Sequence, residues 1–146
     1  MAITSAICNS FKQEILEAEH NFTASTGNTF NLALYDSDAT LGAGTTAYTT
    51  SEEITNTSGT AYTAKGKALT SVTPTLDSST AVCDFSDVSW TSASFTANGC
   101  LIFNDSHATD ASVCAIAFGG DKTVSSGTFT IQFPAAAATT AIIRIA

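Results

Sequence analysis

The chain has 146 residues, a formal net charge of −8 at pH 7, and 44% hydrophobic but only 12% charged residues. So few charges at that hydrophobicity exclude a disordered chain, and the length favours one domain with a core of its own. The excess of 13 acidic over 5 basic residues opposes binding to nucleic acid or to an anionic membrane. No apolar run is long enough to span a bilayer, so we expect synthesis and folding in a cytoplasm.

One helix is predicted, over residues 4–19. Ile7, Phe11 and Ile15 recur there at helical spacing behind a Thr4 or Ser5 cap. An amphipathic helix ahead of a β domain covers either an open end of that domain or a neighbouring subunit. We therefore divide the chain into an N-terminal helix or arm (1–27) and a globular body (28–146).

The body is predicted to be all-β. Serine and threonine make up about three residues in ten, and threonine suits strands better than helix surfaces. Alternating or apolar segments predict strands from residue 28 onward and at 46–55, 67–76, 80–91, 93–103, 112–119, 127–133 and 140–146. Pro74 places the third of these at a sheet edge. About eight antiparallel strands with polar turns are typical of a β-sandwich, with jelly-roll and immunoglobulin-like connections both open.

The four cysteines form no ligand-spaced pair. We expect buried free thiols rather than a zinc site or a disulfide scaffold. Cys100 and Cys114 are the one pair for which a disulfide stays open, because they flank a predicted hairpin around 104–111 and one register would place them opposite each other.

Catalytic and ligand-binding signals are weak. His20 and His107 are the available bases, but no nucleophile elbow accompanies them, so we expect no enzyme and no cofactor. The polar segment 104–110 lacks the ligand spacing of a calcium loop and is predicted to be a hairpin loop. Asp36 and Asp38 are predicted to close a turn through Asx hydrogen bonds.

Two further features leave alternatives open. Tyr48, Tyr62 and Trp90 are candidates for a sugar-stacking platform, although the alternation around Trp90 favours the core for that residue. Arg144 lies in an apolar final strand, where it either reaches solvent or, in a central strand, pairs with Asp84 or Asp87.

Several segments resemble small structural proteins of tailed bacteriophages. These segments are MAITSAICNSFKQE at 1–14, FNLALY at 30–35, FGGDK at 118–122, GTFTIQFP at 127–134 and AIIRI at 141–145. They are scaffold strings without a catalytic motif, so no functional residue is carried over. The resemblance implies a virion protein, most plausibly a capsid decoration or cement protein.

That role implies specific partners and a location. The partners would be the major capsid protein and other copies of the chain, as a dimer or trimer, on the outer surface of the capsid. The alternative is a tail, neck or fibre component, or a surface module that grips host polysaccharide through Tyr48, Tyr62 or the 104–111 loop. The residues predicted to form the protein interface are Ile7, Phe11, Lys12, Ile15, Asp105 and His107.

Overall fold

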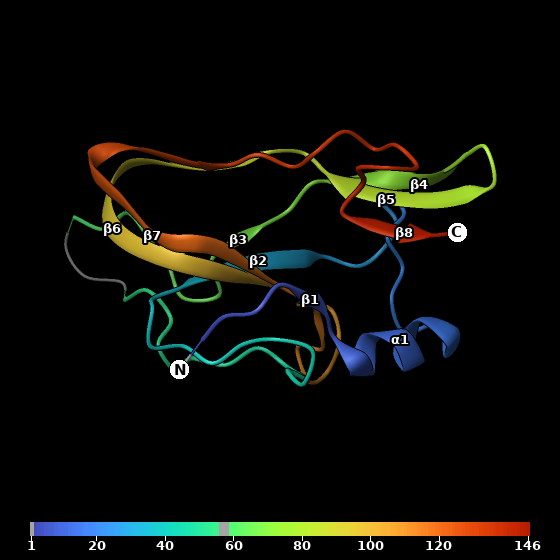
Figure 1. The fold of residues 1–146 in the computed structure, drawn as a ribbon, viewed down its shortest axis with the longest axis horizontal. Coiled ribbons are helices and arrows are strands. Elements are labelled where there is room, and N and C mark those ends of the chain that lie inside the picture. The colour runs from blue at the N-terminus through green and yellow to red at the C-terminus, as the bar shows by residue number, and fades with distance from the viewer. Residues whose placement is uncertain (1, 56–58) are drawn as a thin grey trace.

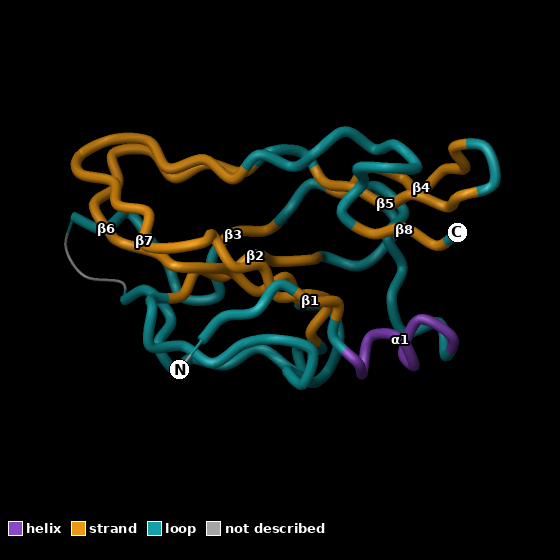
Figure 2. Tube along the Cα trace, viewed as in Figure 1, coloured by secondary structure: helices purple, strands orange, loops and turns teal. Residues whose placement is uncertain are grey.

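The protein is described by a computed structural model that covers residues 2–55 and 59–146. Antiparallel β-strands and one short helix, α1 (Asn9–Leu16), make up its regular structure, which confirms the predicted all-β class. The strands are β1 (Ala6–Ile7), β2 (Phe30–Tyr35), β3 (Lys67–Ala68), β4 (Ser71–Asp77), β5 (Thr80–Phe85), β6 (Val88–Asn104), β7 (Ser112–Ile131) and β8 (Ile143–Ile145). They form a five-stranded sheet, ordered β1-β7-β6-β2-β3, and a three-stranded sheet, ordered β4-β5-β8 (Figure 2).

The hairpin of β6 and β7 is the backbone of the fold. The half of the hairpin next to its loop contains Gly99–Asn104 of β6 and pairs with β2 inside the five-stranded sheet; we call it the far half. Its near half, residues 88–97 and 122–131, forms a two-stranded ribbon. Between the halves, residues 118–121 of β7 form a large bulge, with positive φ angles at Gly119 and Gly120. Figure 1 shows the ribbon turning back over the sheet at this bend.

The bulge explains the main errors in the predicted strands. Residues 119–122 look like a turn, yet they only bend a strand that continues to Ile131. The predicted segments 112–119 and 127–133 therefore fall on one strand, β7, which ends two residues before the second segment does. The predicted segment 67–76 is divided between β3 and β4 in different sheets. No strand spans 46–55, because within the described residues this segment makes only isolated bridges. The edge position predicted from Pro74 is confirmed, since β4 ends its sheet.

The helix is shorter than predicted. Ile3 bridges to Leu41, and β1 pairs with Ala115 and Cys114 of β7, so strand pairing takes the segment that was expected to form the first helical turn. The N-cap is Cys8, in an extended conformation and without a side-chain cap, instead of Thr4 or Ser5. Phe11 joins the main core, so α1 covers part of its own domain, as one of the two alternatives predicted.

Around β2 the five-stranded sheet is covered on both faces. Leu32 and Leu34 of β2 belong to the main core, and Tyr35 on the other face belongs to a second cluster with Leu41 and Phe103. The loop after β2 and the N-terminal segment supply the second cover. Because both faces are covered, β2 lacks the exposed face that its period-two pattern suggests.

The cysteines behave as predicted. All four are free and buried. Cys100 lies opposite Ile116 and Cys114 lies opposite Ile102, so the register does not place the two thiols across from each other. Burial raises the pKa of Cys83 and of Cys114 to about 12.

Candidate functional site: an apolar cleft along α1, β7 and β8

A groove of about 650 Å³ separates α1 from the C-terminal strand β8. Figure 1 shows α1 lying beneath the three-stranded sheet, with β8 the nearest of its strands. Four of the predicted interface residues line the groove, namely Ile7, Phe11, Lys12 and Ile15. The opposite wall is the run of residues 142–146, which were not predicted to belong to any site. The structure therefore brings the predicted α1 residues together with a wall that only the fold reveals.

The groove is the outer end of the hydrophobic core. Leu76, Ala81 and Ile145 are paired across β4, β5 and β8, and directly paired residues point to the same face of a sheet. Ala81 and Ile145 also line a smaller apolar cavity that Phe11 borders, so this row faces α1. Leu76 is 72% exposed and Ile145 is 58% exposed. The apolar row thus continues from the covered core to solvent.

The helix adds a further exposed apolar side chain. Leu16, at the end of α1, is 87% exposed and lines the same groove. Among the described residues, four large hydrophobic side chains are exposed, and three of them, Leu16, Leu76 and Ile145, lie at this groove or on its row. Single exposed leucines are ordinary, but clustered ones mark interaction surfaces.

A second open cavity, of about 520 Å³, lies between the two halves of the bent hairpin. Cys100 and Ile116 line it from the far half, and Phe129 and Ile131 line it from the near half. Ile142 lines both this cavity and the groove at α1, so the two spaces are neighbours that share this side chain. We call the two spaces together the lateral cleft.

The basic residues are unequally distributed. Lys65 lies between Asp105 and Asp110, at 2.9 and 2.8 Å, and these hydrogen bonds raise the pKa of its ammonium group. Lys67 donates to the Ser89 carbonyl and lies over the Trp90 ring. The other three, Lys12, Lys122 and Arg144, line the lateral cleft. Within the described part of the chain, none of these three has a carboxylate within 4.0 Å.

Arg144 follows the first of its two predicted alternatives. It is exposed on the edge strand β8, and its guanidinium donates to the Ala138 carbonyl at 3.2 Å. Among the described residues neither alternative partner forms an ion pair with Arg144: Asp87 accepts from the Phe133 amide, and Asp84 is buried with one oxygen unbonded. A central strand, which the pairing required, is not where the fold puts this residue.

Asp105 and His107 lie in the hairpin loop predicted between β6 and β7, and neither is among the groove-lining residues. Lys65 holds Asp105, and His107 Nε2 lies 3.4 Å from a Glu19 carboxylate oxygen. Both side chains therefore make contacts within the chain. Its structure separates them from the four interface candidates on β1 and α1.

The His20 side chain is fully buried. Its side chain has 0% exposure, its Nε2 lies 2.8 Å from a Glu14 oxygen, and the Asn104 amide donates to its Nδ1 at 3.1 Å. The ring also packs against Phe11 and Phe30. Both ring nitrogens are engaged, so His20 joins the segment after α1 to the last residue of β6.

The predicted sugar platform is not formed. Tyr62 and Trp90 are each 1% exposed, so neither offers a ring face to a ligand; for Trp90 the core position was the favoured prediction. The Tyr48 ring stacks on Phe103 and its hydroxyl donates to Glu53. Burial and this hydrogen bond raise the pKa of Tyr48 to about 12.

Glu53 organises this side of the protein and was not singled out in the sequence. Its carboxylate accepts from the Tyr48 hydroxyl at 2.6 Å, the Tyr62 hydroxyl at 2.7 Å and the Lys65 amide at 2.8 Å. The Tyr62 hydroxyl in turn accepts from the Leu34 amide of β2. Gly66 completes the arrangement, because its φ is positive and a Cβ there would overlap the Leu32 carbonyl. No local pattern distinguishes such a glutamate from an exposed one.

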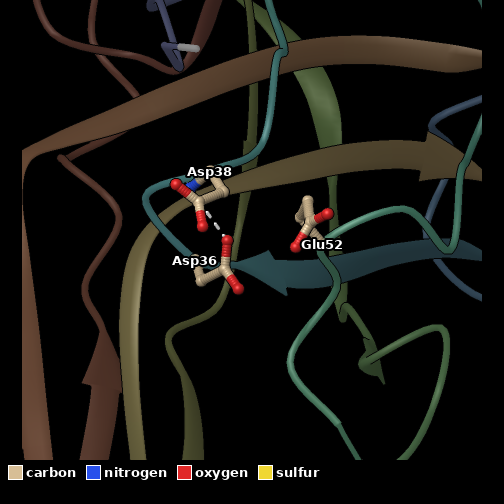
Figure 3. Close-up of side chains that lie close together, drawn as sticks. All are labelled: Asp36, Asp38 and Glu52. Carbon is tan, nitrogen blue, oxygen red and sulfur yellow. Dashed lines mark hydrogen bonds between the residues drawn. The ribbon is translucent and has the colours of Figure 1, made fainter.

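One acidic cluster lies at the end of β2. The Asp36 carboxylate accepts from the Asp38 amide at 2.9 Å, which confirms the predicted Asx turn, and Glu52 lies beside them (Figure 3). One oxygen from each residue lies within 4.8 Å of the others. Three such oxygens fall short of the roughly six to eight that calcium takes. The cluster is an acidic surface feature.

Comparison of the chain with protein-family models, curated proteins and solved structures finds no match. Among the helices of the described residues, none is long and apolar enough to cross a membrane.

Proposed function

We propose that the protein is a non-enzymatic structural protein of a tailed-bacteriophage virion, a cement protein that binds major capsid subunits on the outer surface of the shell. We further propose that its two sheets form a β-sandwich that is open along one side. The proposal rests on the resemblance of its segments to small phage structural proteins and on the apolar groove between α1 and β8.

The groove is the observation that carries the proposal. Leu16 and Ile145 expose apolar surface at its rim, and water is removed from such surface when a partner covers it. Each Å² of apolar surface covered contributes about 25 cal/mol, so a large, shape-matched contact stabilises a complex without catalytic chemistry. A net charge of −8 keeps many free copies apart before they dock.

Binding to particles tests this role. The purified protein is mixed with shells of the bacteriophage that encodes it, and bound copies are counted after sedimentation. Hundreds of copies per particle support the cement role, whereas a dozen or fewer indicate the tail or neck alternative. An absence of binding to particles of any kind contradicts the proposal.

A matched pair of variants links binding to the groove. Leu16→Ser combined with Ile145→Ser is expected to reduce occupancy at least tenfold while the protein stays folded, because both side chains are exposed. Val72→Ser is the control, since Val72 is an exposed apolar residue of β4 outside the residues that line the groove. Equal loss with both variants would contradict the assignment of the site.

A further inference from the structure

The lateral cleft runs along unpaired strand edges. β8 is the end strand of its sheet, and β7 pairs with β1 only through Cys114 and Ala115. Among the described residues, the near half of β7 therefore pairs on one side alone. All three residues of β8, Ile143–Ile145, line the groove, and the last three residues of β7, 129–131, line the adjoining cavity. Neighbours in a strand point to opposite faces, so a space lined by consecutive residues follows the edge of the strand.

An unpaired edge and an apolar trough together fit one kind of occupant. The backbone amides and carbonyls of an edge strand pair with an extended segment, and the apolar wall accepts every second side chain of that segment. Phe118, Phe129 and Phe133 are only partly buried, so the cleft offers aromatic contacts that this chain does not itself complete. A helix would leave the strand edge unpaired.

The charges of the cleft define the chemistry of the segment. Lys12, Lys122 and Arg144 line it, and no carboxylate of the described residues lies within 4.0 Å of them, whereas Lys65 and Lys67 are engaged elsewhere. In a chain of net charge −8, the three unpaired cations gather on one apolar space. Opposite charge across an interface favours association and fixes register.

We infer that the lateral cleft binds an extended segment of another virion protein that adds a strand to β8, places alternate apolar side chains in the cleft, and presents carboxylates to Lys12, Arg144 and Lys122. This inference rests on the proposed function, because it names the part of the partner that the site takes. A second copy of the chain is a poorer occupant: symmetric pairing of two β8 edges would bring Arg144 close to Arg144.

Photo-cross-linking on particles tests the inference. Benzoylphenylalanine replaces Ile145 or Phe118 in the cleft and, as the control, Thr63, which is exposed and outside the lining residues. We expect both cleft positions to cross-link to one segment of about ten residues that carries Asp or Glu, and no such product from position 63. Cross-links to a second copy, to unrelated segments, or only from position 63 would overturn the inference.

A charge-matched comparison tests the electrostatic part. The variant Lys12→Gln, Lys122→Gln, Arg144→Gln is expected to bind particles at least tenfold more weakly and with less dependence on salt. The control adds the same three negative units elsewhere on exposed positions, through Ser51→Asp, Thr63→Glu and Ala64→Glu. Equal weakening in both variants overturns the inference. Normal occupancy without cleft cross-links overturns it but leaves the cement role standing, whereas no binding at all removes both.

Discussion

The two halves of the β6–β7 hairpin show how one pair of strands serves two purposes. In the far half, Gly99–Asn104 of β6 is buried along its whole length beside β2. In the near half, much of β7 after Phe118 is exposed or half-buried and borders the lateral cleft. The strands are continuous, so the difference comes from what packs against them. We call the far half, together with β2, Glu53 and the loop after β2, the closed side. We call the near half, together with the three-stranded sheet that borders the lateral cleft, the open side.

The largest expected effect comes from the polar centre of the closed side. Glu53→Ala removes the acceptor of the buried Tyr62 hydroxyl, the partly buried Tyr48 hydroxyl and one backbone amide, and we expect the free energy of unfolding to fall by about 3 kcal/mol. Glu52→Ala, at the neighbouring exposed carboxylate, should change it by less than about 0.5 kcal/mol. Urea unfolding of both variants measures the contrast, and similar midpoints would show that the closed side does not depend on this network.

The same substitution, leucine to alanine, can be made on both sides and its effect on stability compared. Leu34 has 0% exposure in β2, and Leu34→Ala should destabilise the fold by about 3 kcal/mol through lost burial and a cavity. Leu76 is 72% exposed, and Leu76→Ala should cost less than about 0.5 kcal/mol. Thermal and urea denaturation check this pair. A large loss for Leu76→Ala would mean that the open side is already covered within the isolated chain.

Raising the pH should lower the free energy of unfolding by a smaller amount, which depends on how well the thiols are buried from solvent. Burial raises the pKa of Cys83 and Cys114 to about 12 from an ordinary value of 9.0. Between these values the unfolded chain has released protons that the folded chain retains, so stability falls as pH rises. Each such thiol contributes a slope of up to about 1.4 kcal/mol per pH unit.

Urea unfolding in a reducing buffer at pH 7.5, 9 and 10 measures this slope. Cys83→Ala should make it shallower, because one of the shifted groups is gone. Rapid alkylation of the native thiols at pH 8.5, at the rate of a free cysteine, would contradict the burial on which the prediction depends.

Local sequence signals predicted the parts of the fold that local signals decide. The alternation of Phe30, Leu32 and Leu34 predicted β2, Pro74 predicted an edge, and the polar run after Asn104 predicted a hairpin loop. The bend at Gly119 was predicted as a turn because a bulge and a turn use the same residues. Strand pairing with residues distant in the chain makes these residues a bulge within β7 and not a turn between two strands.

For the same reason, only one wall of the candidate site could be predicted from the sequence. The apolar stripe of the predicted helix identified Phe11 and Ile15, and Lys12 was predicted beside them at the interface. The opposite wall on β8 and the cation at Lys122 join these residues only through the fold. Asp105 and His107 have the composition of a binding loop, but Lys65 and Glu19 bind them from segments distant in sequence. Glu53 gave no signal, because its role depends on two tyrosines that the fold brings to it.

Amide hydrogen exchange, with and without particles, tests the contrast between the closed and open sides most directly. In the free protein we expect slow exchange in β2 and Gly99–Asn104 of β6, and faster exchange in β8 and residues 129–132, where strand edges are unpaired. On particles, new protection should be confined to β8 and residues 129–132. Protection that appears instead over the loop after β2, with β8 unchanged, would contradict the account.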